Sequence, residues 1–238
     1  MKNFIVYNGI QLSDYGVFIS GDGTFNAPER DTQTVEVVGR NGELTLDNGR
    51  YKNIEVTYPA FVVSDFAENI EKLRNILLKQ QGNVRIEDTY HPQQFRIGKF
   101  TGSFKVKPIP ELYAGEFDIT FNCYPQRFLK SGEDPIEFTS GGTIYSKYLQ
   151  EAKPLIRAYG TGSFSIGGVS IQITTANGYT DIDCDLQEAY KDTLATSCNG
   201  NIVLTNDAFP VLKEGDNVVT ISGLTKLVIY PRYLQDLC

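Results

Sequence analysis

The chain has 238 residues, of which 41% are hydrophobic and 21% charged, enough apolar material for one large or two ordinary globular domains. Its formal net charge of −7 disfavours proteins that hold nucleic acid by neutralising phosphates. A single histidine, His91, excludes a multi-histidine metal site within one chain. Because no apolar run is long enough for a signal peptide or a membrane span, we expect a soluble protein.

Alternation of apolar and polar residues predicts that much of the chain is antiparallel sheet. It is clearest over 116–123, where every second residue from Phe117 to Cys123 is apolar. Asn-Gly pairs at Asn41 and Asn48 lie on either side of Leu44, and this dipeptide is typical of tight reversals between strands.

One segment has a helical period instead. Between about Asp65 and Gln81, four apolar residues fall on a single helical face. They are Phe66, Ile70, Leu73 and Leu77. Asp65 and Glu68 form a capping-box-like start, and Gly82 can adopt the left-handed conformation that ends helices. We therefore predict one helix over 65–81, packed on the sheet of the first domain.

Composition predicts two domains, 1–134 and 135–238, joined near the polar segment 131–135. The second part has Gly-rich turns between short strands and no long helical period, which is typical of an all-β sandwich. The four cysteines share no Cys-x-x-Cys spacing, and two of them, Cys123 and Cys184, fall at inward positions of strand patterns. We expect free, reduced thiols.

Three patterns could carry chemistry, and each has a simpler interpretation. His91 is close to Asp88, but no Gly-x-Ser-x-Gly elbow supplies a nucleophile, so a turn histidine between strands is favoured. Asp181, Asp183, Asp185 and Asp192 match calcium-loop positions, but Leu186 stands where the loop requires glycine. These acids more simply form the solvent-facing side of a strand. Gly160-Thr161-Gly162 lacks a following helix and is interpreted as a turn.

A fourth pattern interleaves basic and aromatic residues, as single-strand nucleic-acid binders do. The tract consists of Phe95, Arg96, Lys99, Phe100, Phe104, Lys105 and Lys107. Strand alternation explains it better, with Phe104 and Val106 facing inward and the lysines outward. The sequence thus predicts no catalytic, cofactor-binding or metal-binding residues, and no enzyme.

Several short segments, in this order, resemble the distal tail protein family of siphophages that infect Gram-positive bacteria. In the first part they are Asn8-Gly9-Ile10, Tyr15-Gly16-Val17, Val38 to Leu44, the capped helix and Phe121 to Phe128. In the second part they are Ala152 to Ile156, Tyr159 to Gly162, Ile182-Asp183, Ala189-Tyr190, Phe209 to Leu212, Gly215 to Asn217 and Tyr230-Pro231-Arg232.

This resemblance implies a mainly β protein with an N-terminal β-sandwich-like ring domain and a C-terminal galectin-like β-sandwich. It implies a homo-hexameric hub that joins the tail tube protein to a tail-tip or baseplate protein and leaves a channel for DNA. The protein would be part of the virion tail tip, assembled in the host cytoplasm, with no cofactor, no specific nucleic-acid binding and no membrane partner.

Two alternatives remain open at this stage. A carbohydrate-binding module or adhesin would use the galectin-like domain, but the chain has no Trp and the sequence does not show its tyrosines clustered. A hydrolase would need two carboxylates that meet only in the fold. The hairpin suggested over Gly39–Tyr51 either bridges neighbouring subunits or belongs to the sheet of its own subunit.

Overall fold

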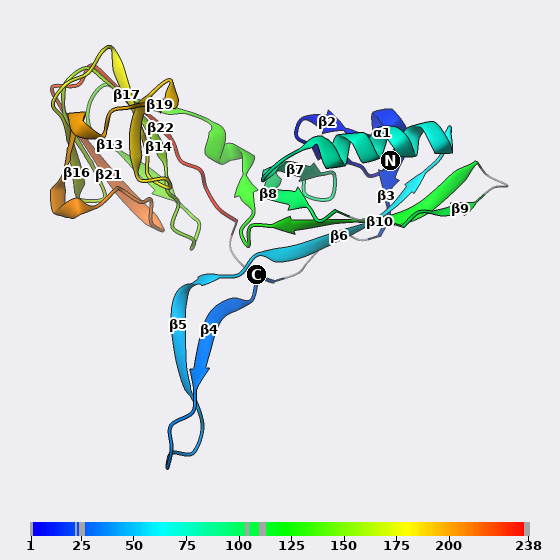
Figure 1. The fold of residues 1–238 in the computed structure, drawn as a ribbon. Helices are drawn as coiled ribbons and strands as arrows, with labels where there is room; N and C mark the ends of the chain where they lie inside the picture. The colour runs from blue at the N-terminus through cyan, green and yellow to red at the C-terminus, as the bar shows by residue number, and fades with distance from the viewer. Residues whose placement is uncertain (1, 22, 24–26, 103–104, 110–112, 236–238) are drawn as a thin grey trace. The chain divides into compact units, whose positions relative to one another are not determined.

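The computed structural model describes residues 2–21, 23, 27–102, 105–109 and 113–235 (Figure 1). The described chain divides into two compact units, with the boundary between Arg127 and Phe128. Within these residues, the mainly β fold with a single α-helix that the sequence predicts is confirmed. No helix among the described residues is long and apolar enough to cross a membrane.

The first unit is built on one curled sheet with strand order β2-β1-β7-β8-β10-β6-β3, and β9 pairs with β10. The strands are β1 (Ile5–Tyr7), β2 (Ile10–Gln11), β3 (Val17–Ile19), β6 (Ile54–Val62), β7 (Val84–Asp88), β8 (Gln94–Phe100), β9 (Lys107–Ile109) and β10 (Ala114–Cys123). The Ile19 N–H donates to the Asn3 carbonyl at 2.8 Å, so the sheet curls until its two sides meet. One sheet therefore supplies opposite walls of the core.

The longest strand pair, β6 with β10, shows why the alternating pattern was informative. The two strands run antiparallel from Gly115 opposite Val62 to Cys123 opposite Ile54. Phe117, Ile119, Phe121 and Cys123 are all buried, as the alternation predicts. Tyr58 and Val56 of β6 contribute to the same core, so each strand presents one apolar face to the interior.

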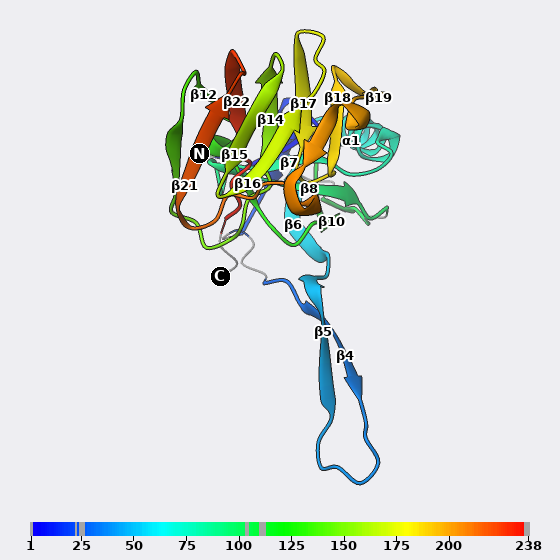
Figure 2. The same ribbon diagram turned by 90° about the vertical axis from the view of Figure 1, so that its left-hand side faces the viewer.

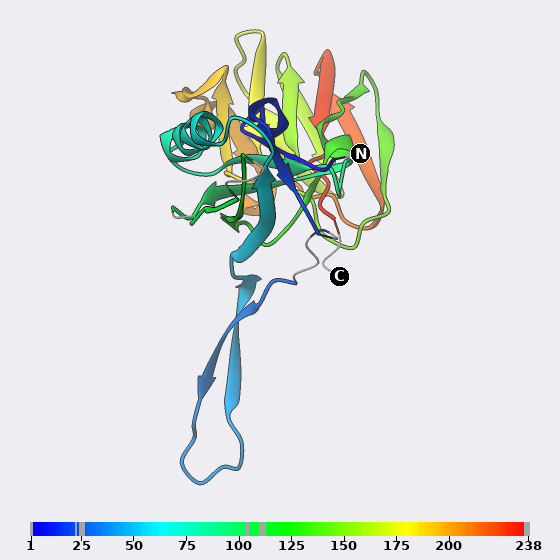
Figure 3. The same ribbon diagram turned by 90° about the vertical axis from the view of Figure 1, so that its right-hand side faces the viewer.

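The helix α1 spans Phe66–Lys79 and covers this core (Figure 3). Leu73 and Leu77 are buried, and Phe66 and Ile70 pack against the same cluster, which confirms the predicted stripe. The predicted cap is wrong: Asp65 has a φ of 44° and its side chain accepts no capping hydrogen bond. The helix ends earlier than expected because Gln80 is already extended.

The second unit is a sandwich of two antiparallel sheets, ordered β12-β22-β14-β17-β18-β19 and β13-β21-β15-β16-β20 (Figure 2). The first sheet contains β12 (Ile136–Phe138), β14 (Leu155–Tyr159), β17 (Tyr179–Asp183), β18 (Glu188–Lys191), β19 (Thr193–Ser197) and β22 (Lys226–Tyr230). The second contains β13 (Gly142–Ser146), β15 (Gly162–Ile166), β16 (Val169–Ile173), β20 (Ile202–Leu204) and β21 (Gly215–Ser222). Inward residues of both sheets, such as Ile156 and Phe164, form one core.

The described residues also form several short elements. They are the two-residue strand β11 (Phe128–Leu129) and the 3-10 helices η1 (Leu12–Tyr15), η3 (Lys130–Glu133), η4 (Asn199–Asn201) and η5 (Thr205–Asp207). Gly160 lies in the turn between β14 and β15 at a φ of +86°, and Gly162 is the first residue of β15, so the turn interpretation of this motif is confirmed.

Candidate assembly surface

A two-stranded hairpin extends from the first unit and is the part of the molecule with the least support from its own chain (Figures 1 and 3). Its strands β4 (Arg30–Val35) and β5 (Leu44–Tyr51) pair with each other and with no other described strand. Only Lys52 and Asn53 separate β5 from β6 of the curled sheet. The hairpin is thus an exposed extension of β6, whose alternate side chains are buried.

The hairpin has two chemically different faces. The register places Gln33 opposite Leu46 and Val35 opposite Leu44, so these four side chains share one face. The other face carries threonines 32, 34 and 45 together with Asp47. On the first face, Val35, Leu44 and Leu46 are 42%, 37% and 53% exposed. One side of the hairpin is therefore an uncovered apolar surface, and the other is polar.

Charged pairs hold the base of the hairpin. The Arg30 Nε donates to Asp47 at 2.5 Å, and the Arg50 Nε donates to Asp31 at 2.7 Å. The hydrogen bond from Arg50 lowers the pKa of Asp31 below its ordinary value. The backbone N–H of Gly49, and then Arg30, lower the pKa of Asp47 in the same way. Both carboxylates are ionised at neutral pH, so the cross-strand pairs fix the strand register where the hairpin leaves the sheet.

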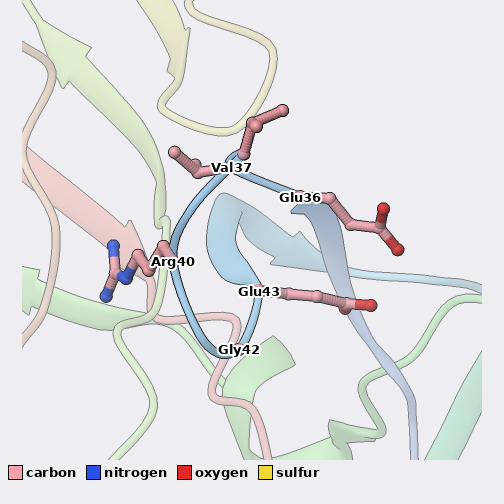
Figure 4. Close-up of a pocket in the computed structure, with 6 residues that line it drawn as sticks. Glu36, Val37, Arg40, Gly42 and Glu43 are labelled. Atoms are coloured by element: carbon pink, nitrogen blue, oxygen red, sulfur yellow. The ribbon is translucent and has the colours of Figure 1, made fainter.

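The loop at the tip of the hairpin, residues 36–43, carries basic and acidic side chains on opposite sides (Figure 4). Arg40 points to one side of the loop, whereas Glu36 and Glu43 point to the other. A concavity of about 300 Å³ lies among these side chains, Val37, Val38 and Gly42. The Val38 side chain is completely exposed, and nothing in the described chain covers it.

A second concavity, of about 520 Å³, lies on the curled sheet of the first unit. Its lining consists of Ser20, Pro59, Ala60, Phe61, Lys105, Lys107, Glu116, Phe117 and Asp118. The register of β6 with β10 brings Phe61 opposite Glu116 and Pro59 opposite Asp118. The first unit thus presents an apolar hairpin at one place and a groove with apolar and charged walls at another.

His91 and Asp88, the candidate catalytic pair, are in contact, but their other contacts are those of a turn between strands. The His91 Nδ1 lies 3.0 Å from Asp88 Oδ1, and the Tyr58 hydroxyl donates to the other carboxylate oxygen at 2.8 Å. Burial, followed by the nearby Asp88 charge, raises the pKa of Tyr58 far above its ordinary value. His91 lies in the turn between β7 and β8, as the simpler interpretation predicted.

Two of the four aspartates that resembled a calcium loop, Asp181 and Asp183, form ion pairs with arginines. Arg157 donates two hydrogen bonds to Asp181, at 2.7 and 2.9 Å, and Arg232 donates two to Asp183, both at 2.8 Å. Asp181 and Asp183 are each only 3% exposed, so the predicted solvent-facing side of the strand is wrong for both. Within the described ranges, no three His, Cys, Asp or Glu side chains come together as metal ligands.

The fold also gathers aromatic residues that the sequence did not show as a cluster. Tyr159 of β14 lies opposite Tyr179 of β17, and their ring centroids are 5.6 Å apart. The Arg157 guanidinium lies 4.3 Å from the centre of the Tyr179 ring, and the Lys226 ammonium lies 5.1 Å from that of Tyr159. Only the strand register could reveal this pairing, because the two tyrosines are distant in sequence.

Comparisons with known proteins agree with this architecture. Residues 10–123 match the family model described as a phage tail protein RIFT-related domain. No curated protein matches the chain. Among solved structures, the Dit protein of phage SPP1 superposes with a TM-score of 0.73 at 14% identity, covering 99% of each chain. That protein is described as a paradigm of the hub adsorption apparatus in phages that infect Gram-positive bacteria.

Two structures of the phage p2 baseplate in its activated conformation are also similar. The one with Ca superposes with a TM-score of 0.56 at 9% identity, covering 99% of this chain and 98% of that one. The one with Sr gives 0.52 at 11% identity and covers 96% of each chain.

Residues 10–123 thus resemble a phage tail protein domain, and the whole chain shares the fold of the SPP1 Dit protein and of the p2 baseplate structures. The resemblance to the distal tail proteins of siphophages, expected from the ordered sequence segments, is confirmed.

Proposed function

We propose that this protein is the distal tail protein of a siphophage and forms a homo-hexameric ring at the virion tail tip. In this proposal the ring joins the tail tube protein to a tail-tip or baseplate protein and leaves a channel for DNA. The second unit is a galectin-like spacer outside the ring, and assembly takes place in the host cytoplasm. The observation that carries the proposal is the amphipathic hairpin of the first unit, in a chain that has the fold of a hub protein.

The hairpin supplies what a ring contact requires. A ring interface is heterologous, so each subunit must present two different surfaces that fit each other. An isolated two-stranded hairpin is at best marginally stable in water, and this one exposes three large apolar side chains on a single face. We infer that this face lies on the next subunit. The groove around Phe61, which has apolar walls and charges of both signs, is the matching surface on the same chain.

The charge of the chain fits a DNA channel better than a DNA-binding site. Each copy carries a formal charge of −7, which a ring multiplies. A basic channel wall would hold phosphates by counterion release and slow their passage, whereas a neutral or acidic wall leaves transit free. We therefore expect Asp and Glu to outnumber Lys and Arg on the inner wall.

Solution mass tests the ring with a matched pair of variants. The wild-type protein is expected to form a particle of six subunits in light scattering and native mass spectrometry over a range of concentrations. Leu46→Asp places a charge on the apolar face and is expected to give monomers. Thr45→Asp places the same charge on the polar face of the same strand and is expected to keep the ring. A monomeric wild type, or equal behaviour of the two variants, contradicts the proposal.

The carbohydrate-binding alternative draws on the Tyr159–Tyr179 pair. Sugars stack on aromatic ring faces, but here Arg157 and Lys191 lie over Tyr179 and Lys226 lies over Tyr159. Asp181, which could accept hydrogen bonds from a sugar, is already occupied by Arg157. These contacts favour a self-contained structural face, and we do not expect this unit to bind simple sugars tightly.

A further inference from the structure

The loop at the tip of the hairpin carries charges that have no partner in their own chain. At the base of the hairpin, cations and carboxylates form ion pairs across the two strands. At the tip, in contrast, the side chains of Glu36, Arg40 and Glu43 form no hydrogen bond or ion pair with any described residue. All three residues are exposed. The tip charges are therefore available to another molecule.

Arg40 points toward the side of the hairpin that carries its apolar face. Glu36 follows Val35 in the chain, and strand alternation turns it to the opposite, polar face. Glu43 precedes Leu44 and is turned to the polar face in the same way. Arg40 points away from both glutamates (Figure 4). The apolar face of the hairpin therefore ends in a cation.

The groove on the curled sheet has a definite order of side chains across its strands. Lys107 of β9 lies opposite Glu116 of β10, and Glu116 lies opposite Phe61 of β6, so these three side chains share one face of the sheet. Two residues further along β10, Asp118 lies opposite Pro59 of β6. The acids of β10 therefore lie between a lysine of β9 and the apolar residues of β6.

The acids of this groove are also unpaired. Within the described ranges, the side chains of Glu116 and Asp118 form no hydrogen bond or ion pair, and both are exposed. Lys105 and Lys107, which line the same groove, form none there either. Successive outward residues of a strand are about 7 Å apart, so the forked guanidinium of one arginine can contact both carboxylates.

We propose that Arg40 of one subunit binds Glu116 and Asp118 of the next subunit and fixes how the hairpin lies in the groove. This inference rests on the ring of the proposed function and names the contact that orients it. An apolar face seated on Pro59 and Phe61 has the acids of β10 beside it, and Arg40 is the charge on that face. A shifted hairpin would bring Arg40 against the lysines of the groove, and like charges disfavour such an arrangement.

Charge reversal tests the contact through the subunit concentration at which half of the rings have dissociated, measured by analytical ultracentrifugation. Arg40→Glu is expected to raise that concentration at least about tenfold, because it sets like charges against each other. Glu116→Arg combined with Asp118→Arg should weaken the ring similarly, and the triple variant should recover most of the loss, because the sites are coupled. Arg74→Glu makes the same change in net charge at an exposed position of α1 and should have no effect.

Chemical crosslinking gives a readout that does not depend on affinity. A carbodiimide joins an amine to a carboxylate only where the two are in direct contact, so Arg40→Lys allows the contact to be trapped without changing its charge. Peptide mass spectrometry of mixed light and isotopically heavy subunits is expected to show position 40 joined to Glu116 or Asp118 of a different subunit.

The outcomes separate this contact from the ring itself. A monomeric wild type would contradict the ring and the contact together. A wild-type ring that Arg40→Glu leaves intact, or that the triple variant fails to recover, would contradict the contact alone. So would crosslinks from position 40 that lead only to other carboxylates.

Discussion

Replacing Leu73 by alanine is expected to destabilise the first unit far more than the same replacement at Leu78. The Leu73 side chain is 0% exposed and belongs to the core beneath α1, whereas Leu78 is 58% exposed on the same helix. Truncating a buried leucine removes its transfer free energy and leaves a cavity, which together cost about 2–5 kcal/mol. Truncating an exposed leucine in a helix costs less than about 0.5 kcal/mol.

Urea denaturation followed at 222 nm measures both variants, because α1 is the one α-helix among the described residues. A loss of about 3 kcal/mol is a large part of the 5–15 kcal/mol typical of a domain, so the midpoint for Leu73→Ala should fall clearly below that for Leu78→Ala. Leu73→Asp should prevent folding of the first unit, since it buries an unpaired charge. Equal midpoints for the two alanine variants would show that the stripe does not face the core.

Three further outcomes follow from the contacts described above. Burial alone would raise the pKa of Asp183, but hydrogen bonds from Arg232 and backbone N–H groups lower it overall, so this pair stabilises the second unit above the ordinary aspartate pKa. Its stability should fall as the pH drops below about 4, and less so in Asp183→Asn. Burial raises the pKa of the Cys123 thiol to about 11 and that of Cys184 to about 12, so Cys198 should react with a thiol reagent at pH 8 while these two do not until the protein unfolds. A glycan array probed with micromolar protein should show no retained binding.

Local patterns were enough to predict most of the scaffold. The period of two over 116–123 gave the buried face of β10, because a half-buried strand leaves that pattern directly in the sequence. The helical stripe that includes Leu73 was equally direct. The cap was not, because Asp65 adopts a left-handed backbone conformation, which composition does not reveal.

The surfaces that matter for function depend on pairing between distant residues. Asp181 follows the alternation of a solvent-facing residue, yet it is buried because Arg157 of the neighbouring strand covers it. Arg96 is the opposite case. A charged side chain in a strand is expected to face solvent, yet Arg96 is buried. The apolar face of the hairpin becomes visible only once the register places Val35 opposite Leu44.

The body of the first unit and its hairpin are stabilised to different degrees by contacts within the chain. The curled sheet encloses a continuous core, whereas the hairpin has only its ladder and the ion pairs at its base, such as Arg50 with Asp31. Exposed ion pairs of this kind contribute less than about 1 kcal/mol each, which cannot compensate for ordering a long two-stranded ribbon. Covering Leu46 and its neighbours on another subunit would supply the missing apolar burial. In the ring of the proposed function, assembly and the ordering of the hairpin are one event, so Leu46→Asp should yield monomers and loosen the hairpin together while the core around α1 stays folded.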